Sequence, residues 1–428
     1  MRKNINKLVA VAIGVSVMSG NVIPVFAADA TSATTTQNTS AITNVQAQTN
    51  VKPVLTLDDA IKAAVSNSEI LQLDQRNIDY KDKINDLSEK MDDAPAISGA
   101  LETSDDKKDF DKDTNDVNLK ILKQQMDFDQ DILIQKTTTA YNSIVTSQKQ
   151  IDKAAKALEI KNKELNDAKL KNSLGMVTTT DLTATKLQIE SLQNQQKSSQ
   201  NTLKDAQYSF KNLIGKDVTQ YSLEQDIKYN TFKIDGSVDE YLDNVIENYK
   251  TYNTQLVKLK KDYYDDADNK VSEPPKPSDD KPAKNEGESD ADYSKRVEYK
   301  HNNDINNYMI GLSARLTYLS TKIGVYSEET ILNETKKAFK EQLRTFYTKL
   351  LTTEDSINLL KKNIELNNKQ LSNAKLKYDL GLITKSEYNT QAVSSEDLDL
   401  QLRSAIDSYN TLKEDIQKPW IAFSQSQN

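Results

Sequence analysis

The sequence predicts an all-α protein made of elongated antiparallel coiled-coil hairpins in two tandem repeats. Proline is absent between residues 96 and 273 and between residues 283 and 418, and a proline inside a helix costs about 3 kcal/mol. Apolar residues recur every seven positions within these windows, which predicts left-handed supercoiling of partnered helices. Most of the pattern occurs twice, at an offset of 206 residues.

The shared offset is visible in both long helices of each repeat. In the first long helix, the apolar positions Ile144, Ile151, Leu158 and Leu165 are matched by Leu350, Ile357, Ile364 and Leu371. In the returning helix, Ile189, Leu192, Leu203, Ala206, Phe210 and Leu213 have images that include Leu398, Tyr409, Leu412 and Ile416. A chance amphipathic pattern would not reproduce one offset throughout, so we infer an internal duplication.

Each repeat is expected to contain a shorter helix, a polar insert, a very long helix, a glycine turn and a returning helix. Repeat 1 covers 55–220, with helices at about 57–90, 115–173 and 178–214 and an insert at 91–114. Repeat 2 covers 221–417, with helices at about 238–265, 307–379 and 384–417, a disordered insert at 266–306, and a tail at 418–428. At 1.5 Å per residue, the helix at 115–173 would be about 88 Å long. This length predicts a rod, in which the first helix stacks end to end with the returning helix.

The first 27 residues are expected to be a signal peptide. Arg2, Lys3 and Lys7 form a basic region, residues 8–18 are apolar, and Val25-Phe26-Ala27 fits a cleavage site. Residues 28–54 are predicted to be a disordered polar linker, and export to the cell envelope or cell wall is expected. The sequence contains no cysteine, which excludes disulfides and a cysteine-linked lipid anchor.

Composition argues against several classes of function. The 64 acidic residues outnumber the 56 basic ones, so nucleic acid is an unsuitable partner. With His301 as the one histidine and no cysteine, there is little material for metal or acid–base catalysis. Asp109, Asp111 and Asp113 alternate as in a calcium loop, but Thr114 replaces the glycine that an EF-hand needs, which favours a solvated acidic loop. We therefore expect no enzyme activity, cofactor or metal site.

Two phrases, LGMVT at 174–178 and LGLIT at 380–384, interrupt the long helices. Gly175 and Gly381 are expected just beyond a helix C-terminus, in the left-handed conformation that glycine tolerates. Each phrase would therefore turn a hairpin, and both hairpins would turn at the same end. The expected capping residues are Thr178 with Asp181, Thr384 with Glu387, and Ser237 with Glu240.

These features resemble the TolC-like outer-membrane efflux protein family. The resemblance covers most of residues 55–417 and rests on LTLDDAIKAAVSNS at 55–68, the two hairpin phrases, and LKDAQYSFKNLIG at 203–215. It implies a homotrimer in which each protomer adds two hairpins to a hollow α-helical barrel. It also implies an efflux or export conduit that works with a membrane-fusion (HlyD-like) adaptor and an ABC-type or other inner transporter.

The resemblance also assigns roles to the hairpin tips. It implies docking onto the adaptor through Gly175, Met176, Val177, Gly381, Leu382 and Ile383. It further implies acids at the pore entrance, which here are Asp181 and Glu387, whereas the next such position is the uncharged Thr390. The alternatives are that the two acids only cap helices and that the apolar tip residues only hold the turns.

The two inserts depart from the family, which carries its membrane-anchoring strands there. The insert at 91–114 offers only APAISGAL before the charges begin, and the insert at 266–306 is rich in proline and charge, so neither contains convincing β-barrel strands. We therefore expect an envelope without an outer membrane, or an outer-membrane location only through an unrecognised anchor. The alternative function is a secreted coiled-coil structural or cell-wall spacer without transport activity.

Overall fold

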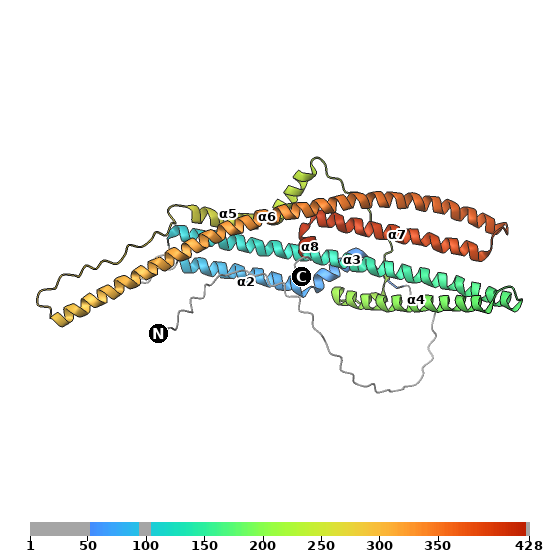
Figure 1. The fold of residues 1–428 in the computed structure, drawn as a ribbon, viewed down its shortest axis with the longest axis horizontal. Helices are drawn as coiled ribbons and strands as arrows, with labels where there is room; N and C mark the ends of the chain where they lie inside the picture. The colour runs from blue at the N-terminus through green and yellow to red at the C-terminus, as the bar shows by residue number, and fades with distance from the viewer. Residues whose placement is uncertain (1–51, 94–103, 425–428) are drawn as a thin grey trace, which may run out of the picture. The chain divides into compact units, whose positions relative to one another are not determined.

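The computed structural model describes residues 52–93 and 104–424. The expected signal peptide, the linker up to residue 51, and residues 94–103 of the first insert lie outside the described residues. In chain order the elements begin with β1 (Val54–Leu55), α1 (Leu57–Asn67), α2 (Glu69–Asp92), α3 (Asp105–Ser173), α4 (Thr179–Ile214), a 3-10 turn (Val218–Gln220) and β2 (Ser222–Leu223). They continue with α5 (Val238–Asp265), α6 (Asp290–Asp379), α7 (Lys385–Gln417) and, in the predicted tail, α8 (Pro419–Ser424). The prediction of an all-α fold of long antiparallel hairpins is confirmed (Figure 1).

The first helix of repeat 1 is divided in two, although the sequence suggested one helix at 57–90. Ser68 takes an extended conformation between α1 and α2, with φ −75° and ψ 111°. Its Oγ accepts a hydrogen bond from the Leu71 backbone N–H at 3.3 Å, so a serine that ends α1 also caps α2.

Both of the very long helices begin earlier than predicted. α3 begins at Asp105 and α6 at Asp290, so the loop prediction was wrong for residues 105–114, which include the acidic triplet. The prediction of disorder was likewise wrong for residues 290–306. Ser104 and Ser289 cap these helices, and acidic residues in each first turn complement the helix dipole. With 69 and 90 residues, α3 and α6 are about 104 Å and 135 Å long.

The helices form a layer four helices wide. α3 packs against α2 and then α4 on one side, and against α5 and then α7 on the other (Figure 1). α6 packs against α5 and then α7. The order is therefore α2–α3–α5–α6 in one half and α4–α3–α7–α6 in the half that holds the hairpin tips. α2 and α4 form one edge of this layer and α6 forms the other.

Each repeat has its own apolar core. The core of repeat 1 joins α1, α3 and α4, and the core of repeat 2 joins α5, α6, α7 and α8. The buried positions repeat at the offset of 206: Ile144 with Leu350, Ile151 with Ile357, Leu203 with Tyr409, and Phe210 with Ile416. The heptad pattern therefore marks the faces that close each hairpin.

A short parallel strand pair lies against the core of repeat 1. β1 pairs with β2 through Val54–Ser222 and Leu55–Leu223. The buried Tyr141 hydroxyl of α3 donates to the Leu55 carbonyl at 2.7 Å and accepts from the Glu224 N–H at 2.7 Å. The strand pair is thereby fastened to the long helix.

The end of α4 meets the break between α1 and α2. The Asn67 side-chain amide donates to the carbonyls of Asn212 at 3.1 Å and Leu213 at 3.3 Å. Gly215 follows in the left-handed conformation, with φ +70°. The carbonyls that a helix end leaves unpaired are thus bound by a side chain of α1.

Candidate docking site at the hairpin tips

The two hairpins turn through the same backbone geometry. In the first tip, Gly175 has φ +71°, its N–H donates to the Asn172 carbonyl at 3.0 Å, and the Met176 N–H donates to the Lys171 carbonyl at 2.9 Å. In the second tip, Gly381 also has φ +71°, and the corresponding bonds measure 2.9 Å and 2.8 Å. Both are Schellman motifs, which end a helix with a left-handed glycine.

The helix after each tip begins with a reciprocal cap. The Thr178 hydroxyl oxygen accepts from the Asp181 N–H at 3.2 Å, and the Asp181 carboxylate accepts from the Thr178 N–H at 3.3 Å. Thr384 and Glu387 make the same pair of bonds at 3.2 Å and 2.7 Å. The hydrogen bonds from the Thr384 backbone and hydroxyl lower the pKa of Glu387. Both acids are exposed, and both serve as caps.

A third predicted cap lies away from the tips, at the start of α5. The Ser237 hydroxyl oxygen accepts from the Glu240 N–H at 3.4 Å. This cap fixes where the first helix of repeat 2 begins.

Each tip presents a group of exposed apolar side chains. Their exposed fractions run from 59% to 71%, and the residues are Leu170, Leu174 and Met176 in the first tip and Leu376, Leu380 and Leu382 in the second. The tip residues Val177 and Ile383, by contrast, are half-buried. The four leucines at 170, 174, 376 and 380 were missed by sequence reasoning, although they occupy matching positions at the offset of 206.

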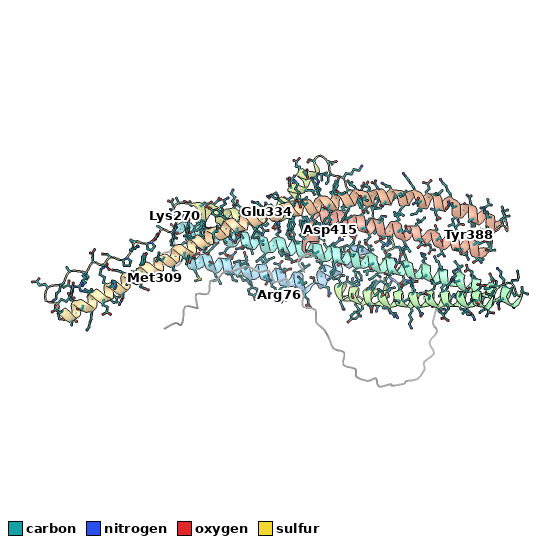
Figure 2. All side chains as sticks on the ribbon, viewed as in Figure 1. Arg76, Lys270, Met309, Glu334, Tyr388 and Asp415 are labelled. Carbon is teal, nitrogen blue, oxygen red and sulfur yellow. The ribbon has the colours of Figure 1, made fainter. Side chains whose placement is uncertain are left out.

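The tips differ in what holds them closed. In the first tip, the Asn172 side-chain amide donates to the Val177 carbonyl at 2.7 Å. The corresponding position in the second tip is Tyr378, whose ring stacks on Tyr388 with centroids 5.7 Å apart. Tyr388 lies near the end of its hairpin (Figure 2). The backbone shape is therefore shared, while the supporting side chains are not.

Polar contacts between α3 and α7 join the two hairpins near the tips. Lys156 pairs with Glu396 at 2.6 Å, and Lys153 pairs with Asp397. Closer to the tips, the Ser386 hydroxyl donates to Glu164 at 3.2 Å. Exposed pairs such as these contribute about 0–1 kcal/mol each, so they align the hairpins more than they stabilise them.

A buried arginine joins α7 to α3 nearer the middle of the two helices. Arg403 of α7 is 6% exposed, and its guanidinium donates to the Gln225 carbonyl at 2.6 Å, to Thr146 at 3.0 Å and to Asn142 at 3.3 Å. The Asn142 amide donates in turn to Asp407 at 2.7 Å. Burial raises the pKa of Asp407, against the hydrogen bond from Asn142 and the charge of Arg403. A buried charge requires its partners in place, so this network fixes α7, and with it the second tip, relative to α3.

The described residues contain neither a candidate metal-binding group nor a candidate membrane-spanning helix. None of their groups of His, Asp and Glu could hold a metal ion. No helix in the ranges 52–93 and 104–424 combines the length and apolar character that crossing a membrane requires.

Comparison with solved structures shows the fold. The chain is similar to a membrane protein from Pseudomonas aeruginosa, with a TM-score of 0.53 and 10% identity over 85% of this chain and 93% of that one. It is similar to the Campylobacter jejuni CmeC outer membrane channel, with a TM-score of 0.52 and 12% identity over 85% of each chain. It is also similar to the open state of the Neisseria gonorrhoeae MtrE outer membrane channel, with a TM-score of 0.51 and 11% identity over 89% of this chain and 93% of that one.

The sequence itself matches no family model, and no curated protein matches it. The structural neighbours are TolC-like channels, so the prediction of a TolC-like fold is confirmed. The expectation that the chain is not an enzyme stays a prediction.

Proposed function

We propose that this chain, which has the TolC-like fold, is a component of an efflux or export conduit in the cell envelope. In this proposal a homotrimer encloses a hollow helical barrel, and the hairpin tips dock onto a membrane-fusion adaptor that links it to an inner transporter. The observation that carries the proposal is the pair of tips, which repeat one backbone geometry and one exposed apolar pattern at the ends of both hairpins.

The exposure of the tips supports docking. Six large apolar side chains on two turns remain in water, although the turn geometry requires only the glycine. The centre of a protein interface is apolar and poor in charge, and these side chains would provide such a centre. Gly175 and Gly381 present open space at the position of a Cβ atom, so a partner backbone can approach them closely.

The free edge of the helix layer supports assembly. α2 carries apolar side chains at alternating spacings of three and four residues, with asparagine at the one polar position, Asn77. Those that are 55–77% exposed are Ile70, Leu73, Tyr80, Ile84, Leu87 and Met91. This spacing is that of a coiled-coil seam, and a neighbouring copy that packed there would bury it.

Asp181 and Glu387 are proposed to act at the pore entrance in addition to capping their helices. The lowered pKa of Glu387 keeps its carboxylate ionised at neutral pH. A glutamine can replace the glutamate of a capping box, so Glu387→Gln removes the charge and keeps the cap. A loss of export without a loss of thermal stability in this variant would support the pore role, and unchanged export would refute it.

A unique thiol beside the second tip tests the docking proposal. The chain has no cysteine, and Lys385 is exposed at the first position of α7. Lys385→Cys would be expressed in the native host, treated with a short bifunctional crosslinker, and analysed by mass spectrometry. Ser404→Cys, exposed on the same helix away from the tip, is the matched control.

The proposal predicts an adaptor peptide joined to residue 385 and absent from residue 404. Crosslinks from residue 385 only to this chain or to wall components, in cells that express an adaptor, would refute it. That outcome would favour the alternative of a coiled-coil spacer in the cell wall.

A further inference from the structure

The first part of α6 extends beyond the helices that support the rest of it. The Tyr318 hydroxyl donates to the Tyr264 carbonyl at 3.0 Å, and the Lys322 ammonium donates to the same carbonyl at 2.9 Å. Because α5 ends at Asp265, residues 290–317 lie past its end, over about 42 Å. Figure 1 shows α6 continuing past α3 and α5. We call residues 290–323 the arm.

One face of the arm is covered by the chain that leads into it. Arg315 donates to the Val271 carbonyl, and a Cβ atom on Gly311 would lie 2.8 Å from Pro274. Arg296 binds the Glu288 carboxylate at 2.8 Å and 2.7 Å. These contacts draw the arginines toward residues 266–289 and leave the rest of the helix surface without a covering segment among the described residues.

The face that adjoins this covered side carries an apolar seam, in which Leu312 is half-buried. Its positions are separated alternately by four and three residues, and they are Ile305, Met309, Leu312, Leu316, Leu319 and Ile323. Leu316 is 70% exposed and Ile323 65% exposed, and Met309 is similarly open to solvent (Figure 2). A seam of this strict spacing is typical of a helix that packs on another helix, whereas a lipid-facing helix presents a wider apolar face.

The seam is free of charges that would repel an identical helix. Between residues 305 and 327 the only charged residues are Arg315 and Lys322, and both bind backbone carbonyls of their own chain. Of the six positions that directly follow seam residues, Asn306, Ser313, Thr317 and Ser320 are polar and Gly324 has no side chain, while Ile310 is apolar and 60% exposed.

We propose that the seam of the arm packs in parallel against the seam of a second copy of this chain. Among the described residues no other helix reaches the level of residues 290–317, so in copies that share one axis only the neighbouring arms lie at that level. The proposal concerns self-association and does not depend on transport.

The size of the seam decides how it should be tested. A leucine-sized side chain buries on the order of 100 Å², so two half-exposed seams would bury roughly 700 Å² in all. Stable interfaces bury about 1,200–2,000 Å². The arms therefore add to other contacts rather than hold copies together alone, and proximity is a better measure than affinity.

Single-cysteine variants of the full-length protein test the arrangement. Identical seam positions face one another in a parallel pair, so Met309→Cys and Leu316→Cys should each form disulfide-linked dimers under mild oxidation. Asn307→Cys, exposed on the arm but outside the seam, is the matched control. We expect yields at least about 10-fold above this control, because a disulfide needs Cβ atoms within about 4.5 Å.

Other occupants would give different results. Equal yields at the seam and control positions would overturn the proposal. Disulfides between Leu316→Cys and Leu87→Cys chains, without dimers of either alone, would show that the α2 stripe covers the arm instead. Flotation with vesicles of phosphatidylglycerol and phosphatidylethanolamine, abolished by Leu316→Asp in the absence of any disulfide dimer, would assign the seam to a lipid surface.

Discussion

Three glycine-to-alanine substitutions should have graded effects on stability, because three glycines meet different constraints. Gly324 lies inside α6, and a Cβ atom added to it would meet no atom within 4 Å. Alanine there should stabilise the protein by about 0.5–1 kcal/mol through helix propensity. Gly175 has equally open space but φ +71°, so alanine should cost about 1–2 kcal/mol from the left-handed backbone alone.

The third glycine combines backbone strain with a steric clash. Gly215 has φ +70°, and its Cβ atom would lie 2.9 Å from Asn67 Oδ1. Moving Asn67 would break its bonds to the Asn212 and Leu213 carbonyls, which contribute about 0.5–1.5 kcal/mol each at most. Added to the backbone strain of about 1–2 kcal/mol, these losses give an expected cost of about 2–5 kcal/mol for Gly215→Ala. In an Asn67→Ala background the same change should cost only the strain, about 1–2 kcal/mol.

Urea titration followed by circular dichroism measures the global free energy of unfolding for each variant. Hydrogen exchange of the peptides around residues 175 and 215 measures the local effect at each turn. Equal losses for Gly175→Ala and Gly215→Ala would refute the role assigned to Asn67. A stabilising Gly175→Ala would refute the left-handed turn.

Two further substitutions test the helix caps and the contact between α3 and α7. Thr384→Ala should destabilise the start of α7 by about 1 kcal/mol, seen as faster hydrogen exchange in its first turns, whereas Thr390→Ala on the same helix should change it little. Arg403→Met should lower the free energy of unfolding by about 2–4 kcal/mol, because it leaves the buried Asn142 and the half-buried Asp407 without the guanidinium. Lys197→Met, at the exposed counterpart in repeat 1, should have little effect. Equal shifts in either pair would contradict the assigned contacts.

The parts of the fold that follow local rules could be predicted from the sequence. The turns at Gly175 and Gly381 required a glycine in the left-handed region, and the heptads marked the faces that close each hairpin. The starts of α3 and α6 were missed because charge and proline dominate the composition of the inserts. The signal for each helix start was a capping serine followed by aspartates in the first turn. Asp105 and Asp106 follow Ser104, and Asp290 and Asp292 follow Ser289.

The contact between the two hairpins, which α3 and α7 make, could not be predicted from the sequence. A heptad identifies the face that closes a hairpin, but not which flank of α3 meets α7. The duplication is also broken there, because the counterpart of the buried Arg403 is the exposed Lys197. The exposed leucines of the tips were missed because the sequence does not distinguish an exposed apolar residue at a helix end from one that packs there as a hydrophobic staple.

Half-buried carboxyl groups predict that the protein is more stable near pH 5 than at neutral pH. Burial, followed by the charge of Glu414, raises the pKa of Asp415 to about 6. Burial also raises the pKa values of Asp74, Asp129 and Asp407. A group whose pKa is raised by folding contributes stability that is fully present below its unfolded pKa and is lost as pH rises through the folded value.

The Asp415 contribution should therefore disappear between about pH 4 and pH 6. Raising the pKa of Asp415 to about 6 corresponds to roughly 3 kcal/mol, which partial solvent exposure reduces to about 1–2 kcal/mol. Asp415→Asn should raise the unfolding free energy at about pH 7.5 and flatten its dependence on pH down to about pH 5, as urea titrations at both values would measure. Asp399→Asn, exposed on the same helix, should leave that dependence unchanged. Acids whose pKa is lowered, such as Glu387, lose their contribution only at lower pH, so they do not obscure this window. If Asp415→Asn keeps the wild-type slope, burial of this carboxylate carries no cost and the assignment fails.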